Sequence, residues 1–230
     1  MDKIESMRRA CEINDIIFKE IVTDFNFKTE FELAKYILRR FRDFKVVKAY
    51  SPIVANNNSI IHAKPRKKKF SRGFLVLDFG CKFNGWCSDM TRTIFIGKAG
   101  ADEKKLYDLI FNCQVKCSNK VRVGASCFDL EVLSRRLLGN YRKYYTHRLG
   151  HGVGRKVHTE PIFGSTSIDI LKEGDIITIE PGIYIKNKWK DFAIRIEDTI
   201  LVTKTGRDIL CKASKKFIEV SCCVKYSINS

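Results

Sequence analysis

The chain has 230 residues, 44% of them hydrophobic, and a formal net charge of +17, which fits a globular protein of one large domain or two small ones. It contains no run of about 18 apolar residues, and its charged amphipathic N-terminus lacks the apolar centre of a signal peptide, so we predict a cytoplasmic protein without membrane association. Its nine cysteines lack paired CxxC spacing and secretory context, which indicates free buried thiols and excludes a structural zinc site or a disulfide framework.

Two helices are predicted at the N-terminus. Apolar side chains recur between residues 3 and 23 at a spacing close to 3.6, which is typical of an amphipathic helix. A second helix is expected to follow Thr29, an N-cap candidate with Glu32 three residues later, and its apolar side chains include Phe31, Leu33 and Ile37.

A dense basic run follows at residues 64–69, with Arg72 shortly after it. Most other lysines and arginines are dispersed along helical faces, and neither interleaved aromatic residues nor a helix-turn-helix pattern accompanies the run. We therefore predict a solvated loop at residues 64–72 and no nucleic-acid function. The alternative is a loop that steers acidic partners, such as RNA or an acidic peptide.

The elements then repeat. Strands are predicted at residues 74–78, 82–87 and 92–96, after a turn at residues 56–58. Residues 102–121 and 127–139 predict another helix pair, the second capped by Ser126, and strands are expected at 155–158, 175–185 and 193–203. This order predicts one α+β domain over residues 1–220, made of two related halves of about 1–100 and 101–220, with a C-terminal tail at 221–230.

Five residues with metal-binding side chains occur in glycine- or proline-marked turns beside apolar strands: Asp78, Asp89, His151, Glu180 and Glu197. Four carboxylates gathered in one cavity would repel one another, and two divalent cations would neutralise them. Oxygen-rich ligation with one imidazole suits Mn(II), Co(II), Fe(II) or Zn(II). Such a pair activates water at neutral pH, so the expected chemistry is metal-assisted hydrolysis of an amide.

The four histidines of the chain all lie in or near these motifs. His151 is the expected ligand, because the glycines on both sides let the backbone approach closely. We predict that His62 and His158 donate hydrogen bonds to a substrate carbonyl or to the developing oxyanion, and that His147 lies just outside the ligands.

Together the motifs LVLDFG, SDMTRT, GHGVG, ITIEPGIY and IRIEDT resemble those of the pita-bread metallopeptidases, the family of methionine aminopeptidases, aminopeptidase P and prolidase. The resemblance covers nearly the whole chain. It implies a fold of two pseudo-symmetric halves with a curved, mostly antiparallel sheet and outer helices. It also implies a dinuclear site, with Mn²⁺ the first choice of metal, in which Asp89 and Glu197 bridge the ions and Glu180 shuttles a proton.

The same resemblance implies that His62 and His158 contact the substrate and that Arg195, two residues before Glu197, steadies the carboxylates. SDMTRT, EPGIY and RIEDT resemble the Xaa-Pro branch of the family, which predicts cleavage of the N-terminal bond of Xaa-Pro peptides by a metal-bridging hydroxide. The sequence departs from the family's pattern at two positions. Thr159 replaces the acid that commonly follows the histidine at position 158, and Ala193 replaces the glycine that is usual before the RIED motif.

Xaa-Pro enzymes carry an additional N-terminal domain, whereas this chain begins with the first catalytic helix, so we expect no such domain unless the chain is a piece of a longer protein. That architecture favours the first alternative, a methionine aminopeptidase removing initiator Met. The second alternative is a non-catalytic binding module, supported by the basic loop at 64–72. Peptides are the expected partners, and a homodimer is left open.

Overall fold

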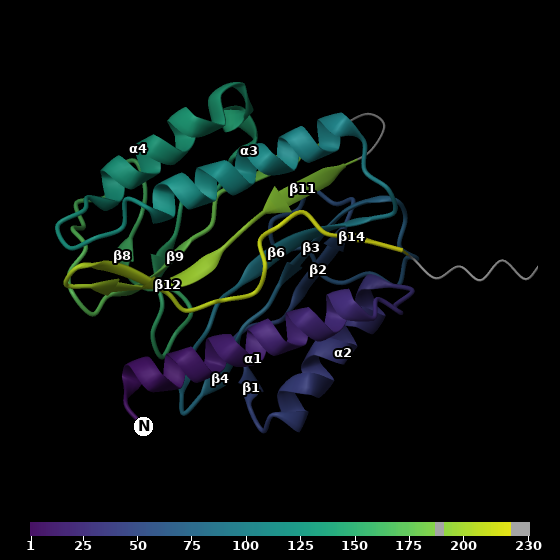
Figure 1. Cartoon of the computed structure of the whole chain (residues 1–230), viewed down its shortest axis with the longest axis horizontal. Coiled ribbons are helices and arrows are strands. Elements are labelled where there is room, and N and C mark those ends of the chain that lie inside the picture. The colour runs from purple at the N-terminus through teal and green to yellow at the C-terminus, as the bar shows by residue number, and fades with distance from the viewer. Residues whose placement is uncertain (187–190, 222–230) are drawn as a thin grey trace, which may run out of the picture.

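Two pairs of helices enclose the strands in the computed structural model, which describes residues 1–186 and 191–221 (Figure 1). The helices are α1 (Lys3–Thr23), α2 (Glu30–Asp43), α3 (Ala101–Ser118), α4 (Cys127–Leu138) and the 3₁₀ helix η1 (Gly139–Tyr144). The strands of the first half are β1 (Val47–Lys48), β2 (Ile53–Asn56), β3 (Gly73–Asp78), β4 (Cys81–Phe83), β5 (Trp86–Cys87) and β6 (Thr91–Ile96). Those of the second are β7 (His151–Gly152), β8 (Thr159–Ile162), β9 (Ile176–Ile179), β10 (Gly182–Ile185), β11 (Phe192–Arg195), β12 (Asp198–Thr203), β13 (Gly206–Ile209) and β14 (Glu219–Val220).

Side-chain caps begin three of the helices. Asp2 forms a capping box with Glu5 ahead of α1, and the hydroxyl of Thr29 accepts a hydrogen bond from the amide of Glu32 at the start of α2. Ser126 caps α4 in the same way, accepting from the amide of Asp129. The predicted helices and the caps at Thr29 and Ser126 are confirmed. Such caps can be predicted from sequence because each hydrogen bond joins residues only three positions apart.

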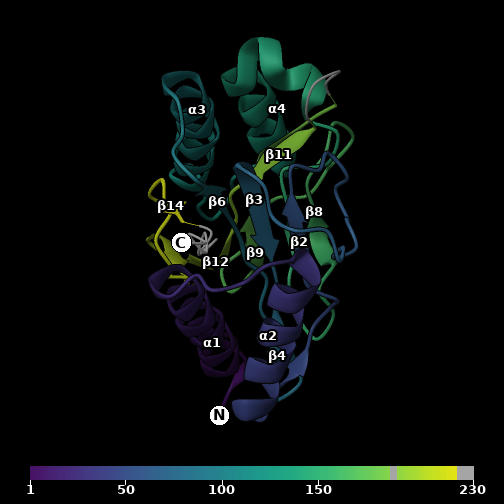
Figure 2. The same cartoon turned by 90° about the vertical axis from the view of Figure 1, so that its right-hand side faces the viewer.

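The sheets are mostly antiparallel, as predicted. A four-stranded sheet has the order β14-β6-β3-β2, and a five-stranded sheet has the order β13-β12-β9-β7-β8. The three-stranded sheet β1-β4-β5 and the pair β10-β11 complete the set, and among the described residues β14 pairs in parallel, with β6. Viewed from the side, α1 and α2 lie on one side of the strands and α3 and α4 on the other (Figure 2).

Each helix pair buries its own apolar core. Met7, Ile17 and Leu33 pack with Leu75 and Leu77 of β3 in the first core. The second core, under α3 and α4, contains Tyr107, Leu130, Ile177, Ile194 and Ile200. The element order therefore repeats as predicted, while the origin of the halves by duplication stays a prediction.

The halves meet along β6 and β11. Thr93 exchanges two hydrogen bonds with Arg195, from its hydroxyl to the carbonyl oxygen at 2.8 Å and from the Arg195 amide to its hydroxyl at 3.1 Å. The amide of Glu197 donates to the carbonyl oxygen of Thr91 at 3.0 Å. We call this contact the β6–β11 seam.

Four predicted strands were wrong in extent. The run 193–203 is split into β11 and β12, because Ile196 and Glu197 lie outside both strands. Residues 82–87 form the β4–β5 hairpin, because Asn84 and Gly85 both have positive φ and make a tight turn. Residues 155–158 are not a strand; they lead into β8, which begins at Thr159. The run 175–185 is split into β9 and β10 around Pro181, which has no amide hydrogen to donate to a ladder.

The seven cysteines within residues 1–186 and 191–221 are free and buried, as predicted. Cys222 and Cys223 lie outside the described residues, as does the predicted tail from residue 222 on. The predicted loop at 64–72 contains no helix or strand longer than a single bridge. Within the same described ranges, no helix combines the length and the apolar character that crossing a membrane requires.

Candidate metal centre

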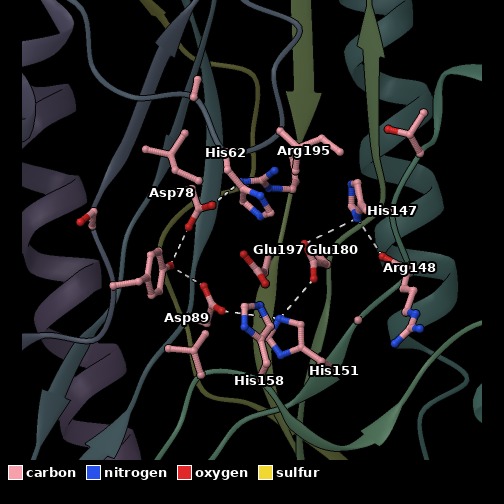
Figure 3. Close-up of a pocket in the computed structure, with 18 of the residues that line it drawn as sticks. His62, Asp78, Asp89, His147, Arg148, His151, His158, Glu180, Arg195 and Glu197 are labelled. Carbon is pink, nitrogen blue, oxygen red and sulfur yellow. Dashed lines mark hydrogen bonds and ion pairs between the residues drawn. The ribbon is translucent and has the colours of Figure 1, made fainter.

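The five predicted ligands come together in one cavity of about 980 Å³ (Figure 3). Asp78 ends β3, and Asp89 lies between β5 and β6. His151 begins β7, Glu180 follows β9, and Glu197 lies between β11 and β12. Each half therefore supplies two carboxylates, and the second half adds the imidazole.

Three of the five have donor atoms close enough to share one ion. The donor atoms of Asp89, His151 and Glu197 all lie within 4.8 Å of one another. Glu180 flanks this group, with its Oε1 3.3 Å from Nε2 of His151. Asp78 lies on the other side, where Arg195 binds it, so the structure places all five around the cavity but brings only three within a single donor cluster among the described residues.

Buried partners hold the carboxylates in place. Arg195 forms an ion pair with Asp78, and its Nε donates to the hydroxyl of Thr91 at 3.1 Å. The same hydroxyl donates to Glu197 at 2.7 Å. The hydroxyl of Tyr50 contacts Oδ1 of Asp78 at 2.6 Å and also Oδ1 of Asp89. The position of Arg195 therefore fits its predicted role beside the ligands.

The electrostatics of the site show crowded negative charge. Burial and the neighbouring carboxylate of Asp78 raise the pKa of Asp89 to about 7. Burial, Asp89 and Glu180 also raise the pKa of Glu197 well above its usual value. Burial alone would raise the pKa of Glu180, but the hydrogen bond with His151 and the electrostatic interactions with His147, His151 and Arg195 together outweigh it and hold that pKa below its usual value. Two of the carboxylates thus resist ionisation in the absence of a cation.

The other histidines surround the same cavity. The ring of His158 lies 4.3 Å from that of His151, centroid to centroid. His147 Nδ1 lies 3.8 Å from Oε2 of Glu180, and its Nε2 is 3.1 Å from the hydroxyl of Tyr184. Burial lowers the pKa of His147 to about 4, so it is neutral at pH 7. His62 lines the cavity from the loop after β2, so all four histidines lie at the site.

Glycines bring backbone segments together around His151, as predicted. A β-carbon at Gly150 would lie 2.0 Å from the carbonyl oxygen of Thr178, and one at Gly152 would lie 2.0 Å from that of Glu160. Both distances are far inside van der Waals contact, so only glycine fits at these positions. At these two contacts β7 packs directly against β9 and β8, which positions the backbone of His151 between them.

Gly152→Ala is expected to lower the free energy of unfolding by about 3 kcal/mol or more, because the new β-carbon would overlap a backbone oxygen that cannot move aside. Gly154→Ala is the matched control in the same motif, since its β-carbon would meet nothing closer than 3.7 Å. Urea unfolding of the two variants measures the difference. Equal free energies of unfolding would contradict the packing role of Gly152.

Several residues at the site escaped the sequence reasoning. Tyr50 precedes a plain Ser-Pro turn and carries no local signal. Thr91 and Tyr184 lie inside the quoted motifs SDMTRT and EPGIY, so their proximity to ligand positions was the available signal. Lys64 and Arg148 also line the cavity. Their positions depend on how loops fold back over the sheet, which residue spacing does not reveal.

Comparison with known proteins shows what the chain is similar to. The model of metallopeptidase family M24 matches residues 5–204. An uncharacterized peptidase of Methanocaldococcus jannaschii is 35% identical over 92% of the chain, and an Xaa-Pro dipeptidase of Pyrococcus horikoshii is 33% identical over 94%. The crystal structure of a prolidase from Thermococcus sibiricus superposes with a TM-score of 0.90 at 32% identity and covers 95% of the chain.

The alignments leave part of each relative unmatched. The chain spans 62% of the Methanocaldococcus protein, 63% of the Pyrococcus dipeptidase and 61% of the Thermococcus prolidase chain. Similarity thus extends along nearly all of this chain but over less than two thirds of those proteins.

Proposed function

The chain belongs to metallopeptidase family M24, and from that premise we propose that it hydrolyses the N-terminal bond of peptides whose second residue is proline. The predicted pita-bread fold is confirmed by the superposition on prolidase. One observation carries the proposal: four carboxylates and an imidazole converge, buried or nearly so, on a single cavity large enough for a short peptide.

The residues present fit a divalent metal site. The donor set is rich in oxygen and contains no thiolate, which suits Mn²⁺, Co²⁺, Fe²⁺ or Zn²⁺. The raised pKa values of Asp89 and Glu197 mark negative charge that nothing in the protein fully compensates, and a cation would compensate it. We assign Asp78, Asp89, His151, Glu180 and Glu197 as the ligands of two ions, with Mn²⁺ the first choice.

Bound divalent ions would supply a deprotonated water nucleophile and would polarise the scissile carbonyl. The protein's own groups complete the chemistry. Glu180, whose pKa lies below its usual value, is ionised at neutral pH and can accept a proton on its carboxylate. His62 and His158 line the cavity on the substrate side and can donate hydrogen bonds to the carbonyl oxygen as it gains charge.

The choice of proline peptides is supported by the names of two relatives, the Pyrococcus Xaa-Pro dipeptidase and the Thermococcus prolidase. It is also supported by the motifs around Thr91, Tyr184 and Arg195. In the structure these three residues are linked, because Arg195 bonds to both the Thr91 and Tyr184 hydroxyls. Removal of initiator Met remains the alternative.

A substrate panel tests the proposal. Metal-free protein reconstituted with Mn²⁺ or Co²⁺ is expected to release the N-terminal residue from Ala-Pro and Ala-Pro-Ala peptides and to leave Met-Ala-Ser intact. Comparing Ala-Pro with Ala-Pro-Ala separates a dipeptidase from an aminopeptidase. Cleavage of the Met peptide alone would overturn the assignment, and absence of both hydrolysis and cation binding would favour the non-catalytic module.

A further inference from the structure

We propose that Lys64, Arg148 and the lysines at 67–69 form a track for carboxylates, so that the enzyme prefers peptides with acidic groups on the carboxyl side of the scissile bond. We call these five residues the basic track. The proposal rests on the proposed peptidase function and names its substrate class. It also gives a role to the basic run that the metal centre does not use.

Two cations of the basic track line the active-site cavity without a charged partner. Lys64 and Arg148 are exposed lining residues, and neither forms an ion pair with any residue in the described ranges. The other two arginines lining the cavity are occupied: Arg135 binds Glu131 at 2.6 Å, and Arg195 binds Asp78. Lys64 and Arg148 are therefore available for a ligand.

The two cations reach the cavity from different segments. Lys64 lies two residues after His62, in the loop after β2. Arg148 lies beside His147, on the side of the site away from Asp78 (Figure 3). A β-carbon built at Gly164 would lie 3.5 Å from Nε of Arg148, so the arginine stem packs over that glycine. Both side chains therefore border the cavity that would hold the peptide.

The loop that carries the lysines is anchored. The buried carboxylate of Glu30 accepts hydrogen bonds from the Arg66 amide at 2.7 Å and from its guanidinium at 2.6 and 2.9 Å. The Arg66 carbonyl accepts from the Phe31 amide at 3.1 Å, and the Phe70 amide donates to the Lys28 carbonyl at 2.9 Å. These hydrogen bonds hold the loop against the start of α2, so the backbone that carries its lysines is fixed.

Beyond Lys64 the anchored loop carries three further lysines that do not line the cavity. The three lysines at 67–69 are exposed, and Lys67 lies over the ring of Phe31 at 5.7 Å. Apart from the four proposed ligand carboxylates, Glu160 is the acidic side chain among the described lining residues. An acidic peptide would therefore meet more positive than negative charge as it leaves the site.

Three peptides test the basic track, each beginning Ala-Pro. One continues Asp-Asp and one Asn-Asn, both with an amidated C-terminus, and the third is the Asn-Asn peptide with a free C-terminus. For the wild-type protein with Mn²⁺, kcat/KM for the Asp peptide is expected to exceed that for the amidated Asn peptide roughly tenfold, through KM. The ratio should fall as ionic strength rises from about 0.02 M to about 0.5 M.

Two double variants locate the effect. Lys64→Ala/Arg148→Ala is expected to bring the ratio of kcat/KM for the Asp peptide to that for the amidated Asn peptide near one. It should retain kcat for the amidated Asn peptide. Lys120→Ala/Arg122→Ala, which removes the same charge from the loop between α3 and α4 outside the cavity, should keep the wild-type ratio. The peptide with a free C-terminus is then compared with the amidated Asn-Asn peptide. If its kcat/KM is higher and Lys64→Ala/Arg148→Ala removes that difference, the α-carboxylate is the group that these two side chains bind.

Equal kcat/KM for the three peptides in the wild-type protein would overturn the proposal. It would also be overturned if poly(U) RNA bound through Lys64 and Arg148 while the peptides showed no preference, because the partner would then be a nucleic acid. If no peptide were hydrolysed, the peptidase function would fail, and calorimetric binding of the Asp and Asn peptides would still decide whether the track selects acidic groups.

Discussion

Glu197→Ala is expected to lower kcat/KM for peptide hydrolysis by about 1,000-fold or more, equivalent to about 4 kcal/mol of transition-state stabilisation. Glu197 is buried, and its donor atom lies within 4.8 Å of those of Asp89 and His151, so its loss removes the carboxylate proposed to bridge the ions. The fold should survive. Within the described part of the chain its side chain accepts a hydrogen bond from the Thr91 hydroxyl at 2.7 Å, and its raised pKa means that its charge is unfavourable without a cation.

Three measurements check this prediction. Steady-state kinetics on the Ala-Pro peptide gives the loss of activity, and urea unfolding of the metal-free protein should give a free energy at least equal to that of the wild type. Added Mn²⁺ should raise the melting temperature of the wild type and raise that of the variant much less, because only the intact site binds the ion tightly. A variant that is active, or one that is unfolded by circular dichroism, would contradict the assignment.

Asp198→Ala is expected to act on stability instead, lowering the free energy of unfolding by about 3 to 5 kcal/mol. Asp198 is fully buried, and its carboxylate accepts from Arg92 Nη2 at 2.8 Å and from Gln114 Nε2 at 2.9 Å, with Lys215 as a further partner. Its removal would leave the guanidinium of Arg92, which is 1% exposed, without its counter-charge.

Asp208→Ala is the matched control. Asp208 lies on the neighbouring strand β13, and its ion pairs with Arg8 and Lys212 are partly exposed to solvent, so its loss should cost less than about 1 kcal/mol. Urea unfolding of both variants measures the difference. A cost for Asp198→Ala no larger than that for Asp208→Ala would show that the buried network around Arg92 contributes little.

The clustering of the five proposed ligands around one cavity was predictable because each of these residues is marked locally. Asp78 ends an apolar strand and Glu180 directly follows one. Burying a carboxylate there costs desolvation energy, so its presence in the sequence indicates a functional role. Glycines on both sides of His151 signalled the close backbone approach that the structure shows at Thr178 and Glu160. The helix caps at Thr29 and Ser126 were predictable for the same reason: their hydrogen bonds span three residues.

Strand limits and cavity walls were harder to predict. The β4–β5 hairpin was missed although Asn84-Gly85 is a strong turn signal, because the flanking residues were read as one continuous strand. Tyr50 reaches Asp78 and Asp89 across separations of 28 and 39 residues, and no spacing rule links them. The anchoring of the basic loop likewise depends on Glu30 and Arg66, which are 36 residues apart.

The β6–β11 seam has a consequence for which ions the site accepts. Asp89 leads into β6 and Glu197 follows β11, so the distance between the carboxylates of the two halves is set by main-chain and threonine hydrogen bonds. If the proposed ligands hold ions, we expect this spacing, and with it Thr93, which joins the two halves through Arg195, to influence which cation sizes the site favours.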